Sequence, residues 1–123
     1  MIVNNRKAYY EFHIHEEFEA GVVLVGSEVK SIRMGNVTLA DSFIYLKDGE
    51  VWLKNMNVAR YKSSHPLTKH DENRDKKLLL NRKEINRIER KLQEKGTTAI
   101  PLSIFLKKNR IKIKIGVATG KKL

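Results

Sequence analysis

Strict alternation of apolar and polar residues near the C-terminal end of the chain constrains the fold more than any other feature. The odd positions of 111–117 are isoleucine or valine, and Lys112 and Lys114 stand between them. A period of two places the apolar residues on one face of a β-strand and the lysines on the other. A second β-type run at 97–105 precedes a polar turn at 107–110, so these segments predict an antiparallel hairpin.

Another hairpin is predicted over residues 41–54. Two short runs of β-branched and aromatic residues meet there at Asp48-Gly49. Because Asp and Gly readily adopt the positive φ angles of a type I′ turn, this dipeptide predicts a tight turn between two paired strands.

One helix is predicted over residues 81–95. Asn81 is a good N-cap, and Glu84 stands three residues further on, as in a capping box. Three apolar residues at helical spacing form a narrow stripe, and Gly96 follows at a position that suits the end of a helix. The stripe consists of Ile85, Ile88 and Leu92.

The patterns in the first half and the middle of the chain are weaker. Alternation over 8–15 predicts a strand, and weak alternation over 28–34 predicts another. Early acidic residues and apolar spacing favour a short helix over 16–25, although its valine-rich end would equally suit a buried strand. Residues 60–77 show little apolar periodicity and predict a long basic loop.

Together these elements predict a mainly β fold with about six strands. The fold class expected is a small antiparallel OB-fold-like barrel with one helix over 81–95 and one or two short helices, because closure removes exposed sheet edges. A helix packed on an open sheet is the alternative. A length of 123 residues supports one core, so we expect a single OB-like domain over 1–123.

The charge of the chain is unevenly distributed. The formal net charge is +11, from 25 basic and 14 acidic residues. Residues 60–95 carry twelve basic and six acidic residues, and residues 96–123 carry seven basic and no acidic residues. This excess predicts a polyanionic partner, and nucleic acid fits better than a membrane surface because no long amphipathic helix carries the charge. No apolar run approaches the roughly 18 residues that span a bilayer.

The sequence gives no positive argument for an enzyme, a metal or a cofactor. The absence of cysteine excludes disulfides and zinc–thiolate sites. His13 and His15 share a strand face, but no further ligand completes a metal site. His65 and Asp71 lie near serines, as the residue types of a hydrolase triad, without the strand–turn–helix context that such a nucleophile needs. A small nuclease with acidic loop residues is a third hypothesis.

Cationic side chains with aromatic neighbours are the candidates for RNA contact, because aromatic rings stack on unpaired bases and cations bind phosphates. These candidates gather at the chain start, around 28–34, at the end of the basic loop and on the last strand. They are Asn5, Arg6, Lys7, Tyr10, Lys30, Arg33, Arg74, Lys76, Lys112, Lys114, Lys121 and Lys122.

Five ordered strings make the sequence specific. They are Phe18-Glu-Ala-Gly, Ser27-Glu-Val-Lys-Ser-Ile-Arg, Ala40-Asp-Ser-Phe, Arg74-Asp-Lys-Lys-Leu-Leu-Leu-Asn and Lys112-Ile-Lys-Ile-Gly-Val-Ala-Thr-Gly-Lys-Lys. In this order they resemble the SmpB family of SsrA-binding proteins, from Asn5 to Lys122.

The resemblance implies a bacterial, cytoplasmic protein with an OB-fold core. It implies an adaptor that binds the tRNA-like domain of transfer-messenger RNA (tmRNA), chiefly the elbow and D-loop region, and delivers it to stalled ribosomes in trans-translation. It implies no enzymatic activity, no cofactor and no membrane, and we expect a monomer. A generic ribosomal or single-stranded RNA-binding OB protein is the alternative that the charge alone would permit.

The resemblance also implies RNA-binding roles for Glu19, Leu79 and Asn81, beside Lys112 and the final lysines. From the residues alone, Glu19 could accept a hydrogen bond from a base amino group, orient a Lys or Arg side chain, or interact with the N-terminus of a helix. Leu79 could pack on a base or seal the core, and Asn81 could cap the helix, contact RNA or do both. Tyr10 stands where the family often has histidine, and the family's basic C-terminal tail is expected to be absent from this chain.

Overall fold

The computed structural model describes residues 1–60 and 71–121, so ten residues of the predicted loop over 60–77, including His65, lie outside the described residues. The helices are α1 (Arg6–Glu11), α2 (Gly26–Arg33) and α3 (Arg82–Leu92). The strands are β1 (Val3–Asn4), β2 (Phe12–Val22), β3 (Val37–Thr38), β4 (Phe43–Lys47), β5 (Glu50–Lys54), β6 (Asn57–Val58), β7 (Lys76–Leu79), β8 (Thr97–Lys107) and β9 (Arg110–Gly120).

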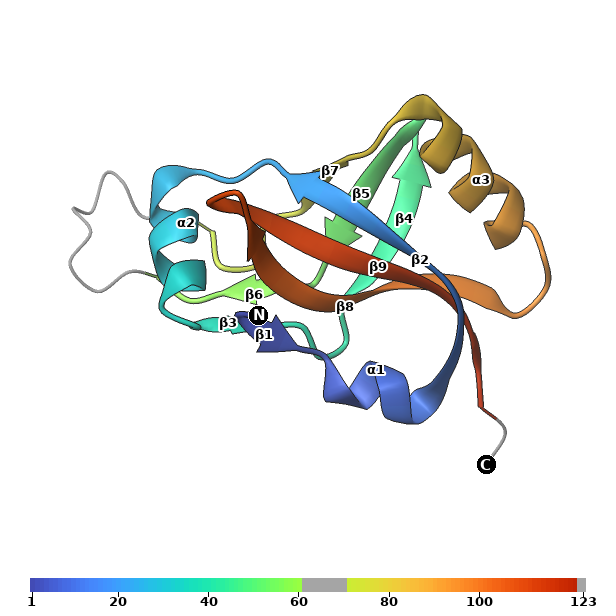
Figure 1. Cartoon of the computed structure of the whole chain (residues 1–123), viewed down its shortest axis with the longest axis horizontal. Helices are drawn as coiled ribbons and strands as arrows, with labels where there is room; N and C mark the ends of the chain where they lie inside the picture. The colour runs from blue at the N-terminus through green and yellow to red at the C-terminus, as the bar shows by residue number, and fades with distance from the viewer. Residues whose placement is uncertain (61–70, 122–123) are drawn as a thin grey trace.

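Six strands form a closed ring. Their order is β8-β4-β5-β7-β2-β9, and the ring closes because β9 pairs with both β2 and β8. Every pairing is antiparallel, β1 adds to the side of β8, and β3 and β6 form a separate pair. Figure 1 shows the long strands β2, β8 and β9 crossing the middle of the molecule, with α3 at one end. The predicted mainly β, OB-like class is therefore confirmed as a ring of six strands.

Both predicted hairpins are present, each with a two-residue turn. Lys47 pairs with Glu50 across Asp48 and Gly49, whose φ angles are 53° and 75°. The second hairpin pairs Lys107 with Arg110 across a turn whose two residues, Lys108 and Asn109, also have positive φ angles. Positive φ at both central residues matches the twist of the flanking strands, so each turn continues the ladder without a splayed end.

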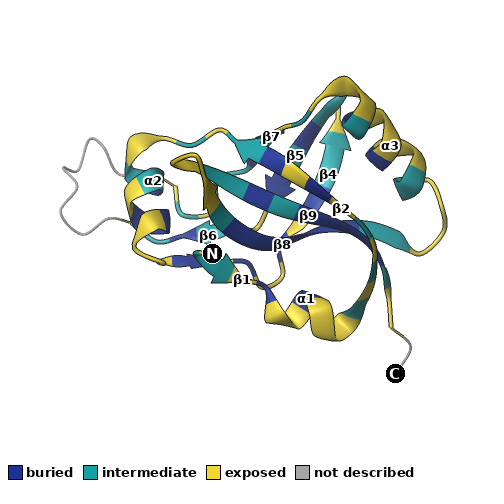
Figure 2. Ribbon diagram, viewed as in Figure 1, coloured by how far each residue is buried: buried dark blue, intermediate teal, exposed yellow. Residues whose placement is uncertain are grey.

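The core fills the inside of the ring. Leu53, Ile104, Ile113 and Ile115 are fully buried and come from three different strands. Helix α3 lies against β8 and β9 and buries Ile88. Figure 2 shows the resulting alternation of buried and exposed positions along the strands. The apolar face predicted for the last strand therefore faces the core, with Ile111 only half-buried at the end near the turn.

The predicted strand over 8–15 begins later than expected, at Phe12. Residues before it form α1, because the Asn5 side chain accepts a hydrogen bond from the Ala8 N–H at 3.3 Å and starts the helix. Ala8 then packs in a small second apolar cluster with Leu102 and Ala118. Gly116 permits this packing, since a Cβ at that position would lie 2.8 Å from Leu102 Cδ1.

The predictions for 16–25 and 28–34 are wrong in type. Strand β2 continues to Val22, because the acidic residues that suggested a helix pair with cations on other elements: Glu16 with Arg87, Glu17 with Lys114. Residues 26–33 form α2, and the Glu28 carboxylate accepts the Val25 N–H at 2.9 Å at its first turn. The strand alternative for this region is therefore correct as far as Val22, and the rest of the valine-rich run connects β2 to α2.

Candidate nucleic-acid interface

A hollow of about 380 Å³ lies where β2, β7, α2 and the β8–β9 turn meet. Its floor is apolar, with Val22, Leu24 and Ile111 among its residues, and Gly21 opens space on β2. Its cations are Arg33, Arg110 and Lys112, and none of the described residues that line it is Asp or Glu. An apolar floor with a wholly cationic rim suits a ligand that combines a flat apolar part with phosphates.

A second hollow continues the first along the hairpin. It is about 450 Å³ and is lined by Glu19 and four cations, two of which, Arg110 and Lys112, it shares with the first hollow. We call the two hollows together the hairpin-tip surface. It consists of Glu19, Arg33, Leu79, Lys107, Lys108, Arg110 and Lys112 with the apolar floor.

Glu19 is the acidic residue of the hairpin-tip surface, and its position in the fold excludes one of its three possible roles. It lies in β2, not at a helix N-terminus. Its Oε2 accepts a hydrogen bond from Lys107 Nζ at 2.9 Å, and this bond lowers the pKa of Glu19 below its ordinary value. The carboxylate therefore stays ionised and orients a lysine at the hairpin tip.

Leu79 lines the first hollow and is 52% exposed, so it does not seal the core. Strand pairing places it opposite Gly21, where an added Cβ would lie 3.3 Å from Leu79 Cβ. Gly21 therefore lets an apolar side chain stand at the surface beside Lys112, which pairs with Gly21 from the other side. An exposed leucine next to a cation is available to pack on a base.

The Arg33 side chain joins α2 to the hairpin tip. Its Nη2 donates to the Asn109 backbone oxygen at 3.1 Å, across the first hollow.

Lys30 lies one turn earlier on α2 and is exposed. Lys114 is half-exposed on β9 and lies 3.7 Å from Glu17. The structure thus brings four of the predicted RNA-binding residues, Glu19, Arg33, Leu79 and Lys112, to one surface.

Arg74 and Lys76 occupy a different environment. Lys76 and Glu28 are both fully buried, with Lys76 Nζ 3.8 Å from Glu28 Oε2. Lys76 Nζ donates to the backbone oxygens of Arg74 at 2.7 Å and Met56 at 3.2 Å. Arg74 clamps the carboxylate with Nη2 to Oε1 at 2.6 Å and Nε to Oε2 at 3.2 Å. We call these three residues the buried charge cluster.

The pKa values in the buried charge cluster follow from burial and pairing. Burial opposes the ionised form of Glu28, but hydrogen bonds from Arg74 and the Val25 N–H bring its pKa below the ordinary value. Burial lowers the pKa of Lys76, and Glu28 offsets part of that effect. The Lys76 side chain is therefore not accessible to a ligand. Its position in a basic stretch of the sequence does not indicate this burial.

Asn81 is the N-cap of α3. Its side chain accepts the Glu84 N–H at 2.9 Å, and Glu84 Oε1 accepts the Asn81 N–H at 3.2 Å. The capping box predicted from the sequence is therefore confirmed. Asn81 is exposed, so this cap leaves a contact with RNA as a prediction.

The candidates at the chain start gather around α1. Asn5 is buried and donates from Nδ2 to the Pro101 backbone oxygen at 2.8 Å, so its amide holds the helix to β8. Arg6 is exposed, and Tyr10 is 84% exposed. Lys121 joins this group, since its Nζ donates to the Tyr9 backbone oxygen at 3.2 Å. Lys122 lies outside the described residues.

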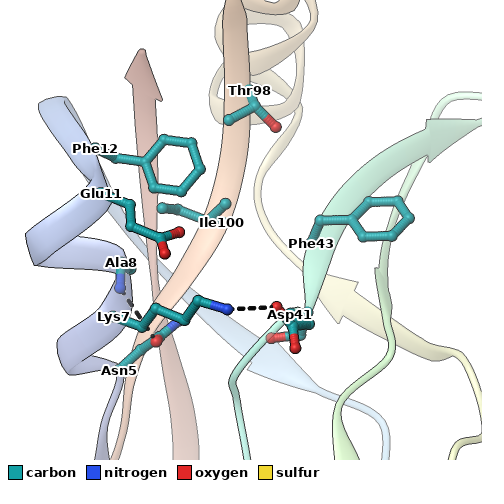
Figure 3. A pocket seen from close by; sticks show the side chains of 10 residues that line it. Asn5, Lys7, Ala8, Glu11, Phe12, Asp41, Phe43, Thr98 and Ile100 are labelled. Atoms are coloured by element: carbon teal, nitrogen blue, oxygen red, sulfur yellow. Dashed lines mark hydrogen bonds and ion pairs between the residues drawn. The ribbon is translucent and has the colours of Figure 1, made fainter. Parts of the chain in front are cut away.

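Lys7 lies at a cavity of about 180 Å³ between α1, β8 and the start of β4. Its Nζ lies 2.8 Å from Asp41 Oδ1, and this hydrogen bond raises the pKa of Lys7. Figure 3 shows the pair at the cavity, which Phe12 and Ile100 also line. The acidic partner makes this cavity less favourable for phosphate than the hairpin-tip surface.

Three cations at this surface, Lys107, Lys108 and Arg110, are not among the residues predicted above to contact RNA. They flank or occupy the β8–β9 turn and line the second hollow. The polar turn at 107–110 was visible in the sequence, but its position beside Glu19 depends on the pairing of β2 with β9.

Metal-ligand groups and membrane-spanning helices are absent from the described residues. Within residues 1–60 and 71–121 there is no group of three His, Asp or Glu side chains that could hold a metal ion. His15 instead has its Nε2 2.8 Å from Thr119 Oγ1. None of the helices in these described parts is long and apolar enough to cross a membrane.

A ring of antiparallel strands that carries an acid-free cationic rim around an apolar hollow defines a small nucleic-acid-binding protein. Comparison with known proteins makes the class specific. The family model described as "SmpB protein" matches residues 2–123. The chain belongs to the SmpB family.

Relatives from several bacteria support this assignment. The SsrA-binding protein of Syntrophomonas wolfei is 51% identical over 122 residues, which cover 99% of this chain and 77% of the relative. The SsrA-binding protein of Caldicellulosiruptor saccharolyticus is 49% identical and is covered to 77% of its length, with 100% of this chain aligned. That of Thermosynechococcus vestitus is 44% identical, with 100% of this chain and 81% of the relative covered.

The fold comparison agrees. A chain of a solved structure described as "tmRNA-SmpB: a journey to the center of the bacterial ribosome" superposes with a TM-score of 0.81. The two chains are 39% identical, and the match covers 98% of this chain and 84% of the other.

Proposed function

We propose that this chain is an adaptor that binds the tRNA-like domain of tmRNA, at its elbow and D-loop region, and delivers it to stalled ribosomes in trans-translation. Membership of the SmpB family supports this role, as do the relatives named SsrA-binding protein and the similarity to SmpB of a tmRNA–SmpB ribosome structure. The activity is binding and delivery, not catalysis. It places the chain in the bacterial cytoplasm, as a monomer with one RNA-binding domain over 1–123.

The observation that carries the proposal is the acid-free first hollow of the hairpin-tip surface. Arg33, Arg110 and Lys112 surround an apolar floor that includes the exposed Leu79. Phosphates of a folded RNA bind the cations and release counterions, and an unpaired base packs on the apolar floor. Lys30 and Lys114 extend the cationic surface, and Glu19 holds Lys107 in place for a phosphate.

The other predicted residues take three roles in this proposal. Arg6, Lys7, Tyr10 and Lys121 contact RNA from the α1 side of the molecule, with Tyr10 as a stacking ring, and Lys122, which lies outside the described residues, is a further RNA contact. Asn81 caps α3 and supports the end of β7 that presents Leu79. Asn5, Arg74 and Lys76 act through the fold, because Asn5 and Lys76 are buried and Arg74 clamps buried Glu28.

A competition experiment tests the proposal. Labelled tmRNA is bound to the full chain at fixed salt and challenged with unlabelled tmRNA or with bulk tRNA. We expect unlabelled tmRNA to displace the label at a much lower concentration than tRNA. Equal competition by the two RNAs would overturn the proposal in favour of a generic RNA-binding protein, and cleavage of the RNA with Mg²⁺ present would favour a nuclease.

A further inference from the structure

Three aromatic residues form a row on the outer face of strands β4 and β5, away from the hairpin-tip surface. Tyr45 and Trp52 are direct cross-strand partners, and the Phe43 ring centroid lies 6.4 Å from that of Tyr45 at 51°. The neighbouring residues Ile44 and Leu53 point inward and are buried. Because successive side chains of a strand alternate between faces, the three rings lie on the outside of the ring of strands. We call Phe43, Tyr45 and Trp52 the aromatic platform.

The aromatic platform is accessible to a ligand. Phe43 is 38% exposed, and Tyr45 and Trp52 are half-buried. Helix α3 packs on β8 and β9, α1 on β8 and β2, and α2 on β6, so the helices pack chiefly on other strands. Phe43 lines the edge of the Lys7 cavity, and Figure 3 shows its ring directed away from Lys7, Glu11 and Phe12.

Lysines border the aromatic platform on three sides. Lys54 is the cross-strand partner of Phe43, Lys77 of β7 is the partner of Trp52, and Lys47 follows Tyr45 on β4. Two carboxylates beside the aromatic platform have partners of their own. Glu50 lies 3.0 Å from Lys77, and Asp75 Oδ2 accepts the Tyr45 hydroxyl at 2.9 Å. Neither Lys47 nor Lys54 forms an ion pair with a carboxylate within residues 1–60 and 71–121.

From this arrangement we propose that the aromatic platform is a second RNA-binding site, which stacks the unpaired bases of a single-stranded segment while the bordering lysines hold its phosphates. Rows of aromatic rings with cations beside them are how proteins bind single strands without a pocket. A protein partner fits less well, because lysine is depleted from protein–protein interfaces. The site is separate from the hairpin-tip surface, so it does not depend on the function proposed above.

The only tryptophan of the chain lies in the aromatic platform, which makes the site directly observable. We titrate the full chain with an unstructured ten-nucleotide oligouridylate and follow the fluorescence of Trp52. A base stacked on the indole quenches its emission, so we expect saturable quenching. Heparin and a blunt RNA duplex of equal length are the controls, since heparin carries charge without bases and the duplex has no unpaired ones.

Two variants assign the binding to the rings and the lysines. Phe43→Leu keeps an apolar side chain but removes a stacking surface, and we expect about tenfold weaker oligouridylate binding. The double variant Lys47→Gln/Lys54→Gln should bind at least about threefold more weakly than Lys83→Gln/Lys95→Gln, which removes the same charge from the region of α3. Thermal unfolding of each variant shows that the fold is intact.

The outcomes are decisive in either direction. Quenching by oligouridylate alone, lost in Phe43→Leu, establishes the site. The proposal is overturned if labelled oligouridylate binds without changing Trp52 emission, if heparin or the duplex quenches equally, or if the two double variants bind alike. These results are independent of tmRNA competition, which reports on the hairpin-tip surface.

Discussion

The hairpin-tip surface and the buried charge cluster both contain cations from the basic half of the chain, yet their surroundings give them opposite uses. At the hairpin tip, Arg110 and Lys112 border an open hollow without a carboxylate among its described lining residues. In the cluster, Lys76 is fully buried and its neighbours supply a carboxylate and two backbone oxygens. A cation whose hydrogen bonds are satisfied within the protein stabilises the fold, whereas a cation at an open surface is available to bind a ligand.

The largest effect is expected on breaking the buried charge cluster. Glu28→Gln leaves Lys76 and Arg74 without their counter-charge, and such a loss in a buried pair costs about 3 kcal/mol of the free energy of unfolding. Denaturant unfolding measures this cost. Asp41→Asn, which breaks the exposed Lys7 pair, is the matched control and should change stability little. If both variants are equally stable, the cluster is not the structural element proposed.

The second effect concerns RNA affinity rather than stability. Arg110→Gln/Lys112→Gln removes two cations from the hairpin-tip surface, and we expect tmRNA binding to weaken about tenfold at moderate salt. The slope of log affinity against log salt should become shallower by roughly two, since two fewer phosphates are neutralised. An unchanged slope would remove these residues from the interface. Unfolding curves should match those of the parent chain, in contrast to Glu28→Gln.

A third variant distinguishes a capping role of Asn81 from a direct contact with RNA. Asn81→Ala removes the cap of α3, and the free energy of unfolding should fall by about 1 kcal/mol. Ser at position 81 retains a capping oxygen and is the control. If Asn81→Ser restores stability but not tmRNA affinity, the amide itself contacts RNA; restoration of both assigns Asn81 to capping alone.

The smallest effect is a pH dependence. The folded-state pKa of Glu28 is below its ordinary value, so the stability that its ionised form contributes is present above the unfolded-state pKa of about 4.3. That contribution is lost as the pH falls through the lower, folded-state pKa. The stability gap between the parent chain and Glu28→Gln should therefore narrow below about pH 4. A gap that stays constant to pH 3 would contradict this account.

Elements set by local signals could be predicted from the sequence. The Asp48-Gly49 turn, the Asn81–Glu84 capping box and the alternation of the last strand each depend on residues close together in the chain, and all three are present. Such signals act through turn chemistry and side-chain spacing, which need no distant partner.

The errors arose where the partner of a residue is distant in the sequence. Glu19 looked compatible with a helix, but its cation is Lys107, across the hairpin. Glu28 looked like part of a strand, but its carboxylate is satisfied by Arg74 and by a helix N-terminus. The basic stretch around Lys76 favours an RNA contact, and nothing near it in the sequence shows that the folded chain buries its side chain.

The pairing of β2 with β9 also has a consequence for how the molecule is made. Residues 12–21 find most of their backbone partners in 112–120, which lie far later in the chain and are therefore synthesised later. Until then β2 has an unpaired edge, and only its last two residues pair with β7. Contacts between such distant segments slow folding. Strand β2 therefore cannot complete its pairing until β9 has been synthesised. Truncation within β9 should leave an aggregation-prone chain rather than a smaller folded one.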